Sequence, residues 1–168
     1  DIQMVFQDAI GSFNPRFTIE ESITEYVCNL CSTTEADKKH KVDNLLRMVG
    51  LSKEYKYRYP HELSGGQCQR AAIARALSAH PKILVCDEAT SALDVSVQAQ
   101  IVELLKEMQE KMNISYLFIT HDLALVSSFC DRVAVMKNGK IVEVGDAKEV
   151  INNPKDEYTK LLIKSAYF

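Results

Sequence analysis

The chain has 168 residues, of which 46% are hydrophobic and 26% charged, and its formal net charge is −3. This length and apolar content suffice for one domain with a hydrophobic core, whereas the slightly acidic balance gives no basis for a nucleic-acid-binding surface. No apolar run approaches the roughly 20 residues that a membrane-spanning helix needs. The five cysteines, an odd number, favour reduced thiols over a disulfide framework.

The first part of the chain combines one short strand with a long helical region. An apolar run from residue 2 to 6 predicts a strand. From about residue 18 to 80 apolar side chains recur at helical spacing, in two amphipathic stretches and an alanine-rich run at 70–77. Cys28 and Cys31 form a C-x-x-C in the first stretch, but no second pair completes a zinc site, so we interpret them as structural thiols. The apolar positions of the two amphipathic stretches are Ile23, Tyr26, Val27 and Leu30, then Val42, Leu45, Leu46 and Val49.

Strands and helices alternate from residue 82 onward. The short apolar runs at 83–86 and 116–119 are typical of strands that are buried on both faces of a parallel sheet, and a helical pattern between them completes a βαβ unit. The runs at 133–136 and 141–144 flank Asn138-Gly139, which predicts a hairpin. Asp146 and Glu149 resemble a helix capping box, and Pro154 follows the end of that helix.

Two polar clusters stand where such a fold presents ligand groups. Asp87 and Glu88 follow the buried run at 83–86, which places two carboxylates at the carboxyl edge of the sheet; the alternative is a solvated strand end. The run 64–67, Ser-Gly-Gly-Gln, fits a capping box, so it is either a well-capped helix or a helix N-terminus that receives a phosphate.

Four segments in the order MVFQD (4–8), LSGGQCQR (63–70), ILVCDEATSALD (83–94) and FITHD (118–122) resemble the ATP-binding subunits of ATP-binding cassette (ABC) transporters. The resemblance implies an α/β fold: a partial P-loop NTPase (RecA-like) core with a parallel sheet, an α-helical subdomain and a C-terminal hairpin and helix. It divides the chain into a strand and Q-loop at 1–17, a helical subdomain with the signature motif at 18–80, and the C-terminal part of the core at 81–168.

The resemblance also assigns roles in the binding and hydrolysis of ATP with Mg²⁺. Asp87 would hold Mg²⁺ through water and Glu88 would be the general base. Gln7, in the Q-loop, would sense Mg²⁺ and the attacking water, and His121 would contact the γ-phosphate or steady that water. Asp94 would belong to the D-loop.

The signature motif has a role in trans by the same resemblance. Ser64, Gly65, Gly66 and Gln67 would cap the γ-phosphate of ATP held by a second nucleotide-binding domain, identical or paralogous.

No P-loop run, G-x-x-x-x-G-K-[ST], occurs in the sequence. The Gly139-Lys140 pair has Ala134 where the first glycine belongs and Ile141 where the hydroxyl belongs, so we interpret it as a turn. In the family the P-loop precedes the MVFQD segment. We therefore expect this chain to be an incomplete nucleotide-binding domain that is inactive by itself.

Further runs, among them SFNPR (12–16), YPHE (59–62) and DVSVQAQ (94–100), are similar to the oligopeptide, dipeptide and nickel importer ATPases. Ala9 and the pair Asp156-Glu157 depart from that subgroup, which has Pro and His-Pro there. No cysteine follows Cys130, so we predict no iron–sulfur site.

The importer resemblance implies a subunit on the cytoplasmic face of the membrane. Its partners would be transmembrane permease subunits and, indirectly, an extracytoplasmic solute-binding protein, with no nucleic acid. The alternative is a soluble ABC ATPase that acts on nucleic acid or the ribosome. The short interval between Gln7 and Ser64, which lacks sustained heptads, favours the importer. A non-catalytic interaction module is disfavoured because Glu88 and His121 are both present.

Overall fold

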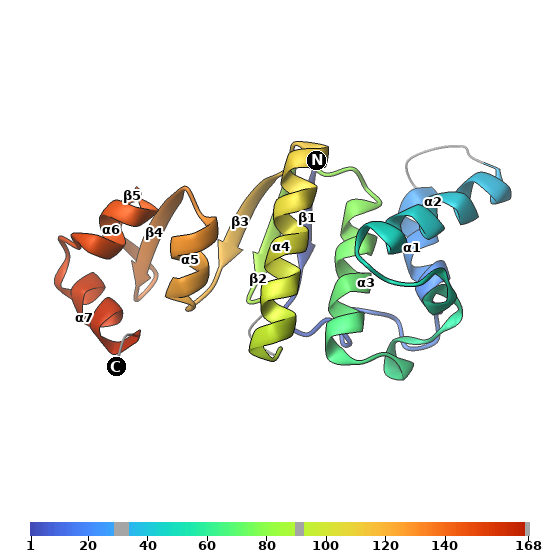
Figure 1. Ribbon diagram of the computed structural model, residues 1–168, viewed down its shortest axis with the longest axis horizontal. Coiled ribbons are helices and arrows are strands. Elements are labelled where there is room, and N and C mark those ends of the chain that lie inside the picture. Colours follow the sequence, from blue (N-terminus) through green and yellow to red (C-terminus); the bar gives the residue numbers. More distant parts are fainter. Residues whose placement is uncertain (29–33, 90–92, 167–168) are drawn as a thin grey trace. The chain divides into compact units, whose positions relative to one another are not determined.

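The computed structural model describes residues 1–28, 34–89 and 93–166, which form two compact units, residues 1–119 and 120–168 (Figure 1). No helix in the described ranges is long and apolar enough to cross a membrane. The predicted segment boundaries at 17 and 80 concern functional parts of the domain and remain predictions.

A three-stranded parallel sheet forms the centre of unit 1. Its strands are β1 (Ile2–Val5), β2 (Ile83–Asp87) and β3 (Ser115–Ile119), in the order β1-β2-β3. Helix α4 (Val95–Met112) connects β2 to β3, which confirms the predicted βαβ unit. Because all three strands run the same way, their carboxyl ends meet at one edge of the sheet.

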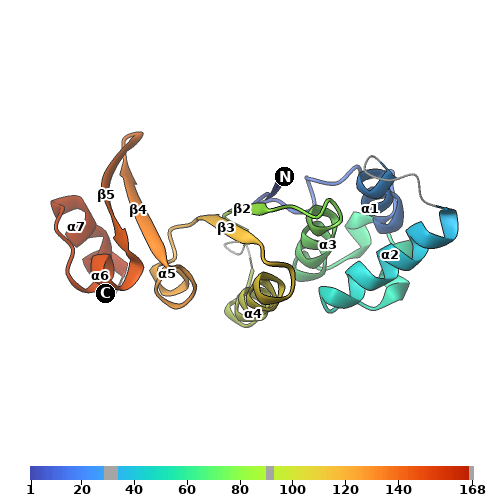
Figure 2. The same cartoon turned by 90° about the horizontal axis from the view of Figure 1, so that it is seen from above.

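One face of this sheet carries two helices, α3 (Gly65–Leu77) and α4 (Figure 2). Val5, Leu84 and Cys86 are on this face, and each is no more than 2% exposed. The Tyr116 hydroxyl, in the same layer, donates to the Leu105 carbonyl of α4 at 2.9 Å. The core of unit 1 therefore lies between the sheet and these helices.

The other face of the sheet is apolar and exposed. Ile2, Leu117 and Ile119 are 60%, 55% and 49% exposed. Side chains alternate between the two faces of a strand, and α3 and α4 both cover the same face. The prediction that the strands are buried on both faces is therefore wrong for the described residues.

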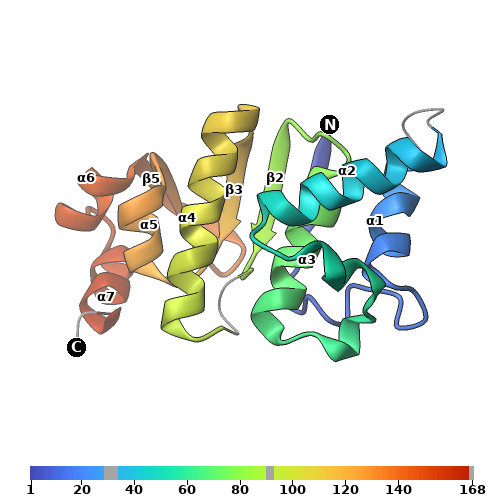
Figure 3. The same ribbon diagram turned by 45° about the vertical axis from the view of Figure 1, so that its right-hand side comes forward.

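The helical subdomain packs α1 (Ile19–Cys28) and α2 (Glu35–Met48) beside α3, as Figure 3 shows. The predicted apolar faces are confirmed where side chains are described, since Ile23, Val42, Leu46 and Val49 are fully buried. Two short 3₁₀ helices, η1 (Lys53–Tyr57) and η2 (Pro60–Glu62), lead from α2 to α3. The structure does not describe the side chains of Cys28 and Cys31, so their structural role remains a prediction.

Unit 2 begins with α5 (Leu123–Phe129) and contains the antiparallel hairpin of β4 (Arg132–Lys137) and β5 (Lys140–Asp146). Asn138 and Gly139 form the predicted turn, with φ angles of 49° and 75°. Positive φ at both central residues is the type I′ pattern that fits the twist of a hairpin. The hairpin prediction is confirmed.

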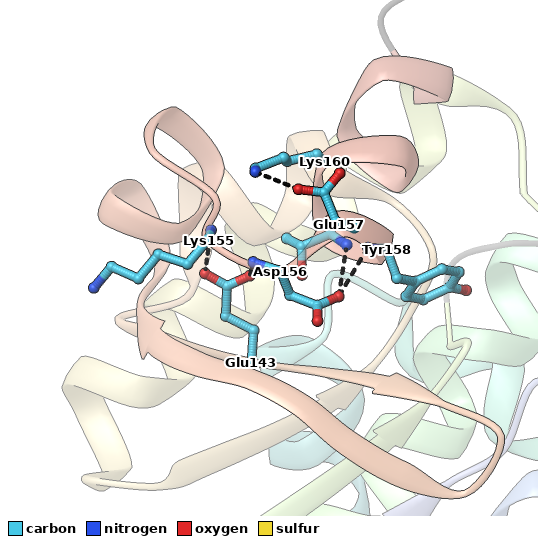
Figure 4. A network of polar contacts seen from close by, with 7 residues as sticks. Glu143, Lys155, Asp156, Glu157, Tyr158 and Lys160 are labelled. Atoms are coloured by element: carbon cyan, nitrogen blue, oxygen red, sulfur yellow. Dashed lines mark hydrogen bonds and ion pairs between the residues drawn. The ribbon is translucent and has the colours of Figure 1, made fainter.

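Helices α6 (Ala147–Asn152) and α7 (Glu157–Ala166) complete unit 2, and a carboxylate of β5 holds the turn between them (Figure 4). Glu143 accepts hydrogen bonds from the N–H groups of Lys155 and Asp156, at 2.9 and 3.1 Å. Asp156 in turn accepts from the N–H of Tyr158 at 2.8 Å in the first turn of α7. Asp156, one of the departures from the importer subgroup, thus starts α7.

Candidate functional site

Three of the predicted site residues of unit 1 lie at the carboxyl edge of its sheet. Asp87 ends β2 and Glu88 follows it, while Gln7 comes two residues after the end of β1. Val5 pairs with Cys86 in the parallel register, so Gln7 and Glu88 both leave the sheet at this edge. The sequence predicted this gathering because it placed each residue at the end of an apolar run.

Glu88 has an uncommon backbone conformation, with φ at 46°. Its N–H donates to the carbonyl of Ile119, the last residue of β3, at 2.9 Å. His80, Asn113 and Asn138 also have positive φ, but histidine and asparagine are enriched in this region. In other non-glycine residues it costs on the order of 1–3 kcal/mol and is concentrated at functional sites. The fold thus holds the Glu88 carboxylate at a strained position at the edge where all three strands end.

The N-terminus of α3 has the predicted capping box. Ser64 Oγ accepts from the Gln67 N–H at 3.3 Å, and Gln67 Oε1 accepts from the Ser64 N–H at 3.0 Å. Gln67 Nε2 donates to the Tyr55 hydroxyl of η1 at 2.9 Å. Both ends of the Gln67 amide are therefore engaged within the chain. The groups that suit an anion are the first-turn N–H groups of Gly65 and Gly66, since a helix leaves its first N–H groups without intrahelical partners.

The two glycines of this turn have different surroundings. A Cβ at Gly66 would lie 2.7 Å from Cγ1 of Val97, in the first turn of α4, whereas a Cβ at Gly65 would lie 3.7 Å from Leu93 Cδ2, at ordinary contact distance. Gly66 thus lets the start of α3 approach the start of α4 closely. Sequence reasoning missed this packing role because Val97 comes much later in the chain.

An open pocket of about 420 Å³ joins three of the predicted segments. One of its lining residues, Gln69 of α3, is 2% exposed, and its Nε2 has no hydrogen-bond partner in the part of the chain that is described. Gln69 carries no signal in the sequence beyond its place three residues after Gly66. The lining residues are Gln7, Asp8, Ala9, Ile10, Gly65, Gln69, Ala89 and Leu93.

Asp94, predicted for the D-loop, is the N-cap of α4. Its Oδ1 accepts from the Ser96 hydroxyl at 2.6 Å and from the Val97 N–H at 2.9 Å. These two bonds, that from Ser96 first, lower the pKa of Asp94 and keep it ionised. Ser91 and Ala92, the start of the D-loop run, lie outside the described residues. The D-loop role remains a prediction.

His121 lies in unit 2, in the turn that starts α5. Asp122 Oδ1 accepts from the N–H groups of Ala124 and Leu125 at 2.8 and 3.1 Å, and the Asp122 N–H donates to Thr120 Oγ1 at 3.0 Å. Asp122, the neighbour of His121, therefore caps the N-terminus of α5. The γ-phosphate role of His121 remains a prediction.

No group of three or more His, Cys, Asp or Glu side chains that could hold a metal ion exists in the described ranges. Mg²⁺ is commonly bound by one or two carboxylates together with water and the phosphates of a nucleotide. Asp87, at the end of β2, fits that arrangement, in which the nucleotide supplies the remaining charge. The carboxylate at this edge thus suits a Mg²⁺ ion that is also coordinated by the phosphates of a nucleotide.

The model of the family described as "ABC transporter" matches residues 1–91, more than half of the chain. Curated relatives include the glutathione import ATP-binding protein GsiA of Pectobacterium atrosepticum, which is 50% identical over 98% of this chain and 26% of its own length. The oligopeptide transport ATP-binding proteins OppF of Bacillus subtilis and Haemophilus influenzae are 47% and 50% identical over 98% of this chain and 54% and 50% of their lengths. The chain thus spans about half the length of these two relatives and about a quarter of the first.

Solved structures agree with the sequence relatives. cbiO1 from Clostridium perfringens, described as part of the ABC transporter complex cbiONQ, has a TM-score of 0.78 at 34% identity over 90% of this chain and 59% of its own. An ATP-binding cassette solved as a dimer in a post-hydrolysis state with ADP and Pi also has a TM-score of 0.78, at 29% identity over 88% of this chain and 63% of its own. The matched motifs, the parallel sheet with its helical subdomain and these relatives together show that the chain belongs to the ABC transporter family.

Proposed function

We propose that the full gene product is the ATP-hydrolysing subunit of an importer for peptides, nickel or a related small solute. The observation that carries this proposal is Glu88, a carboxylate in a strained backbone conformation at the edge where Gln7 and Asp87 also leave the sheet. The relatives at 47–50% identity support peptides as the solute class, because their names state oligopeptide transport and glutathione import.

The residues near this edge have different roles in ATP hydrolysis. Phosphoryl transfer needs positioned charge and an oriented water more than covalent chemistry. Bound Mg²⁺ supplies neutralisation of phosphate charge, and Asp87 is the carboxylate that would face it. Glu88 takes a proton from the attacking water, and Gln7 orients that water from the neighbouring strand end. His121, two residues after the end of β3, steadies the γ-phosphate or the water.

The signature turn acts on a second nucleotide-binding domain. Gly65 and Gly66 provide first-turn N–H groups, and Ser64 caps the same helix end. Gln67 holds the turn through its bonds to Ser64 and Tyr55, so its contribution is to fix the shape of the phosphate-facing backbone. A related cassette, solved as a dimer with ADP and Pi, supports such a pairing.

Membrane partners follow from the transport role. Permease subunits would receive the mechanical output through the helical subdomain formed by α1, α2 and α3, and the protein would stay peripheral at the cytoplasmic face. An extracytoplasmic solute-binding protein would act on the permease and reach this subunit only indirectly. The names of the relatives, which state import and transport, support this assembly.

The decisive experiment uses two variants of the full gene product. Glu88→Gln keeps the size of the side chain and removes its basicity, so steady-state ATPase should fall by about 10²- to 10⁴-fold while ATP still binds. The unhydrolysed nucleotide should then hold two domains together, so Glu88→Gln should elute as a dimer with ATP in size-exclusion chromatography. Ser64→Arg places bulk and charge at the phosphate-facing turn and should prevent that dimer. ATPase near the parental rate in Glu88→Gln would show that Glu88 is not the base.

A further inference from the structure

The loop that follows Gln7 is held by one arginine of the signature helix. Arg75, in the last turn of α3, donates from Nη1 to the Ser12 carbonyl at 2.7 Å and from Nη2 to Ser12 Oγ at 2.9 Å. Its guanidinium also lies over the Phe13 ring, with Cζ 4.2 Å from the ring centroid. One side chain thus makes three contacts with two consecutive residues of the loop.

The loop itself is a turn closed by its own hydrogen bonds. The N–H of Ser12 donates to the carbonyls of Asp8 and Ala9 at 3.1 and 3.2 Å, and Ser12 Oγ donates to the Ala9 carbonyl at 2.7 Å. Gly11 N–H donates to Asp8 Oδ1 at 2.9 Å. Because these bonds connect residues 8 to 12, a displacement at Ser12 is carried back to Asp8, the neighbour of Gln7.

The beginning of the loop has room to shift. Residues 7–10 line the pocket of about 420 Å³, and Gln69 of α3 lies buried on its wall. The end of the loop is fixed instead, since Phe13 is 4% exposed and lies under the guanidinium. Arg75 therefore attaches the end of the loop to α3, whereas the beginning of the loop lines an open pocket.

We propose that Arg75 is a positioning residue that sets where Gln7 stands relative to the catalytic edge. The same helix carries the signature turn at its other end, so Arg75 fixes the Gln7 loop and the phosphate-facing turn to one rigid element. The proposal rests on the proposed function, because it needs Gln7 to orient the water of ATP hydrolysis. Arg75 acts on Gln7 through its contacts with Ser12 and Phe13.

The contact needs arginine rather than any cation. A guanidinium is planar, so it presents two parallel N–H donors to Ser12 and a flat face to Phe13 at once, whereas a lysine ammonium is a point charge that satisfies one of these contacts at a time. Arg75→Lys therefore keeps the positive charge but loses part of the contacts with Ser12 and Phe13.

The test compares Arg75→Lys and Ser12→Ala with Arg70→Lys in the full gene product. Arg70 also lies on α3 and makes two hydrogen bonds, to the Val49 carbonyl and to Gln100 Oε1, both at 2.9 Å, but neither partner is in the Gln7 loop. Hydrogen exchange at the N–H groups of residues 11–13 should be at least about fivefold faster in Arg75→Lys. Ser12→Ala should give a smaller increase, and Arg70→Lys should leave exchange in this loop at the parental rate.

ATP turnover supplies the readout that a merely structural role would not change. Misplacing a water-orienting group by a fraction of an ångström lowers kcat, and we expect a fall of roughly 10- to 100-fold in Arg75→Lys with KM for ATP within about twofold of the parent. If exchange rises but kcat stays parental, or if Arg70→Lys loosens the loop equally, Arg75 is not a positioning residue. A parental protein without ATPase activity would instead overturn the proposed function, so the two failures are distinguishable.

Discussion

At the scale of single residues, the signature turn shows two neighbouring glycines with different constraints. Gly65 has space for a methyl group, since Leu93 Cδ2 lies 3.7 Å away, but at Gly66 the 2.7 Å approach of Val97 leaves none. Neither glycine has a positive φ angle, so the constraint at Gly66 is close packing rather than backbone conformation. A motif that resembles a phosphate-binding run thus also has a packing requirement.

This difference gives a matched pair of substitutions. Gly66→Ala should lower the free energy of unfolding by about 1–3 kcal/mol, because Val97 must move away from an added methyl group. Gly65→Ala should be neutral or stabilise by up to about 1 kcal/mol, because alanine favours the helix and restricts the unfolded chain. Urea denaturation of both variants measures the difference. Equal destabilisation by the two substitutions would contradict the packing role of Gly66.

Buried cysteines at this scale are packing residues. Burial raises the pKa of Cys68 to about 11 and that of Cys86 to about 12. Both thiols therefore stay protonated at neutral pH, which makes them poor nucleophiles and poor metal ligands. Cys86 precedes Asp87 directly, yet its side chain is buried in the core, whereas Asp87 and Glu88 stand at the carboxyl end of β2.

At the scale of elements, two polar contacts fix the positions of segments that connect helices and strands. In the helical subdomain, Lys56 of η1 is 7% exposed and its Nζ lies 2.6 Å from Asp43 Oδ1 of α2. This hydrogen bond raises the pKa of Lys56, so its ammonium stays charged at neutral pH. In unit 2, Glu143 joins β5 to the turn between α6 and α7. Each contact fixes a turn that the helical periodicity of the sequence does not define.

The Glu143 contact makes the C-terminal helices sensitive to acid. The Thr159 hydroxyl and the N–H groups of Lys155 and Asp156 hold the pKa of Glu143 below its usual value of 4.5. A lowered folded-state pKa contributes stability above pH 4.5, and this contribution is lost as pH falls through the folded pKa. Glu143→Gln should therefore lower the thermal midpoint of unit 2 at neutral pH, with a difference from the parent that shrinks in acid.

Circular dichroism melts from neutral pH into acid measure this difference. Glu157→Gln is the matched control, because Glu157 pairs only with Lys160 on the surface of α7, at 2.7 Å, among the contacts that the structure gives. It should leave the midpoint nearly unchanged, since an exposed ion pair contributes little. A midpoint difference for Glu143→Gln that does not depend on pH would show that its carboxylate charge is not what holds the turn.

At the scale of the whole molecule, one face of the three-stranded sheet is not covered by any helix of the described residues. The exposed apolar residues of this face come from all three strands, and an apolar surface of this kind promotes association of copies in water. They are Ile2, Ile83, Leu117 and Ile119, with exposures from 37% to 60%.

We therefore expect the isolated 168-residue chain to self-associate. Leu117→Lys, on β3 at this face, should shift the chain toward monomer in sedimentation velocity. Leu161→Lys is the control, because Leu161 is 63% exposed on α7, a helix of unit 2 that is not part of this sheet. Association that Leu161→Lys reduces as strongly as Leu117→Lys would mean that the sheet face is not responsible.

The sequence by itself determined the order and type of the main elements and the residues at their ends. Periodicity is local, so the helical faces of α2 and α4, the βαβ unit and the Asn138-Gly139 hairpin follow from neighbouring residues. The same holds for the capping box at Ser64 and for the placement of Asp87 and Glu88, because a strand end is a local feature. The family resemblance then supplied chemical roles, which remain predictions for individual residues.

Only the tertiary structure decided what depends on contacts between distant segments. It places Val97 against Gly66, Arg75 against Ser12, and a pocket between the Gln7 loop and α3. It also shows that an apolar strand need not be buried on both faces, because burial depends on where the helices lie rather than on the strand's own residues. The positive φ of Glu88 belongs to this class too, because the residue type does not indicate it and the Glu88 N–H bonds to β3, a segment distant in the sequence.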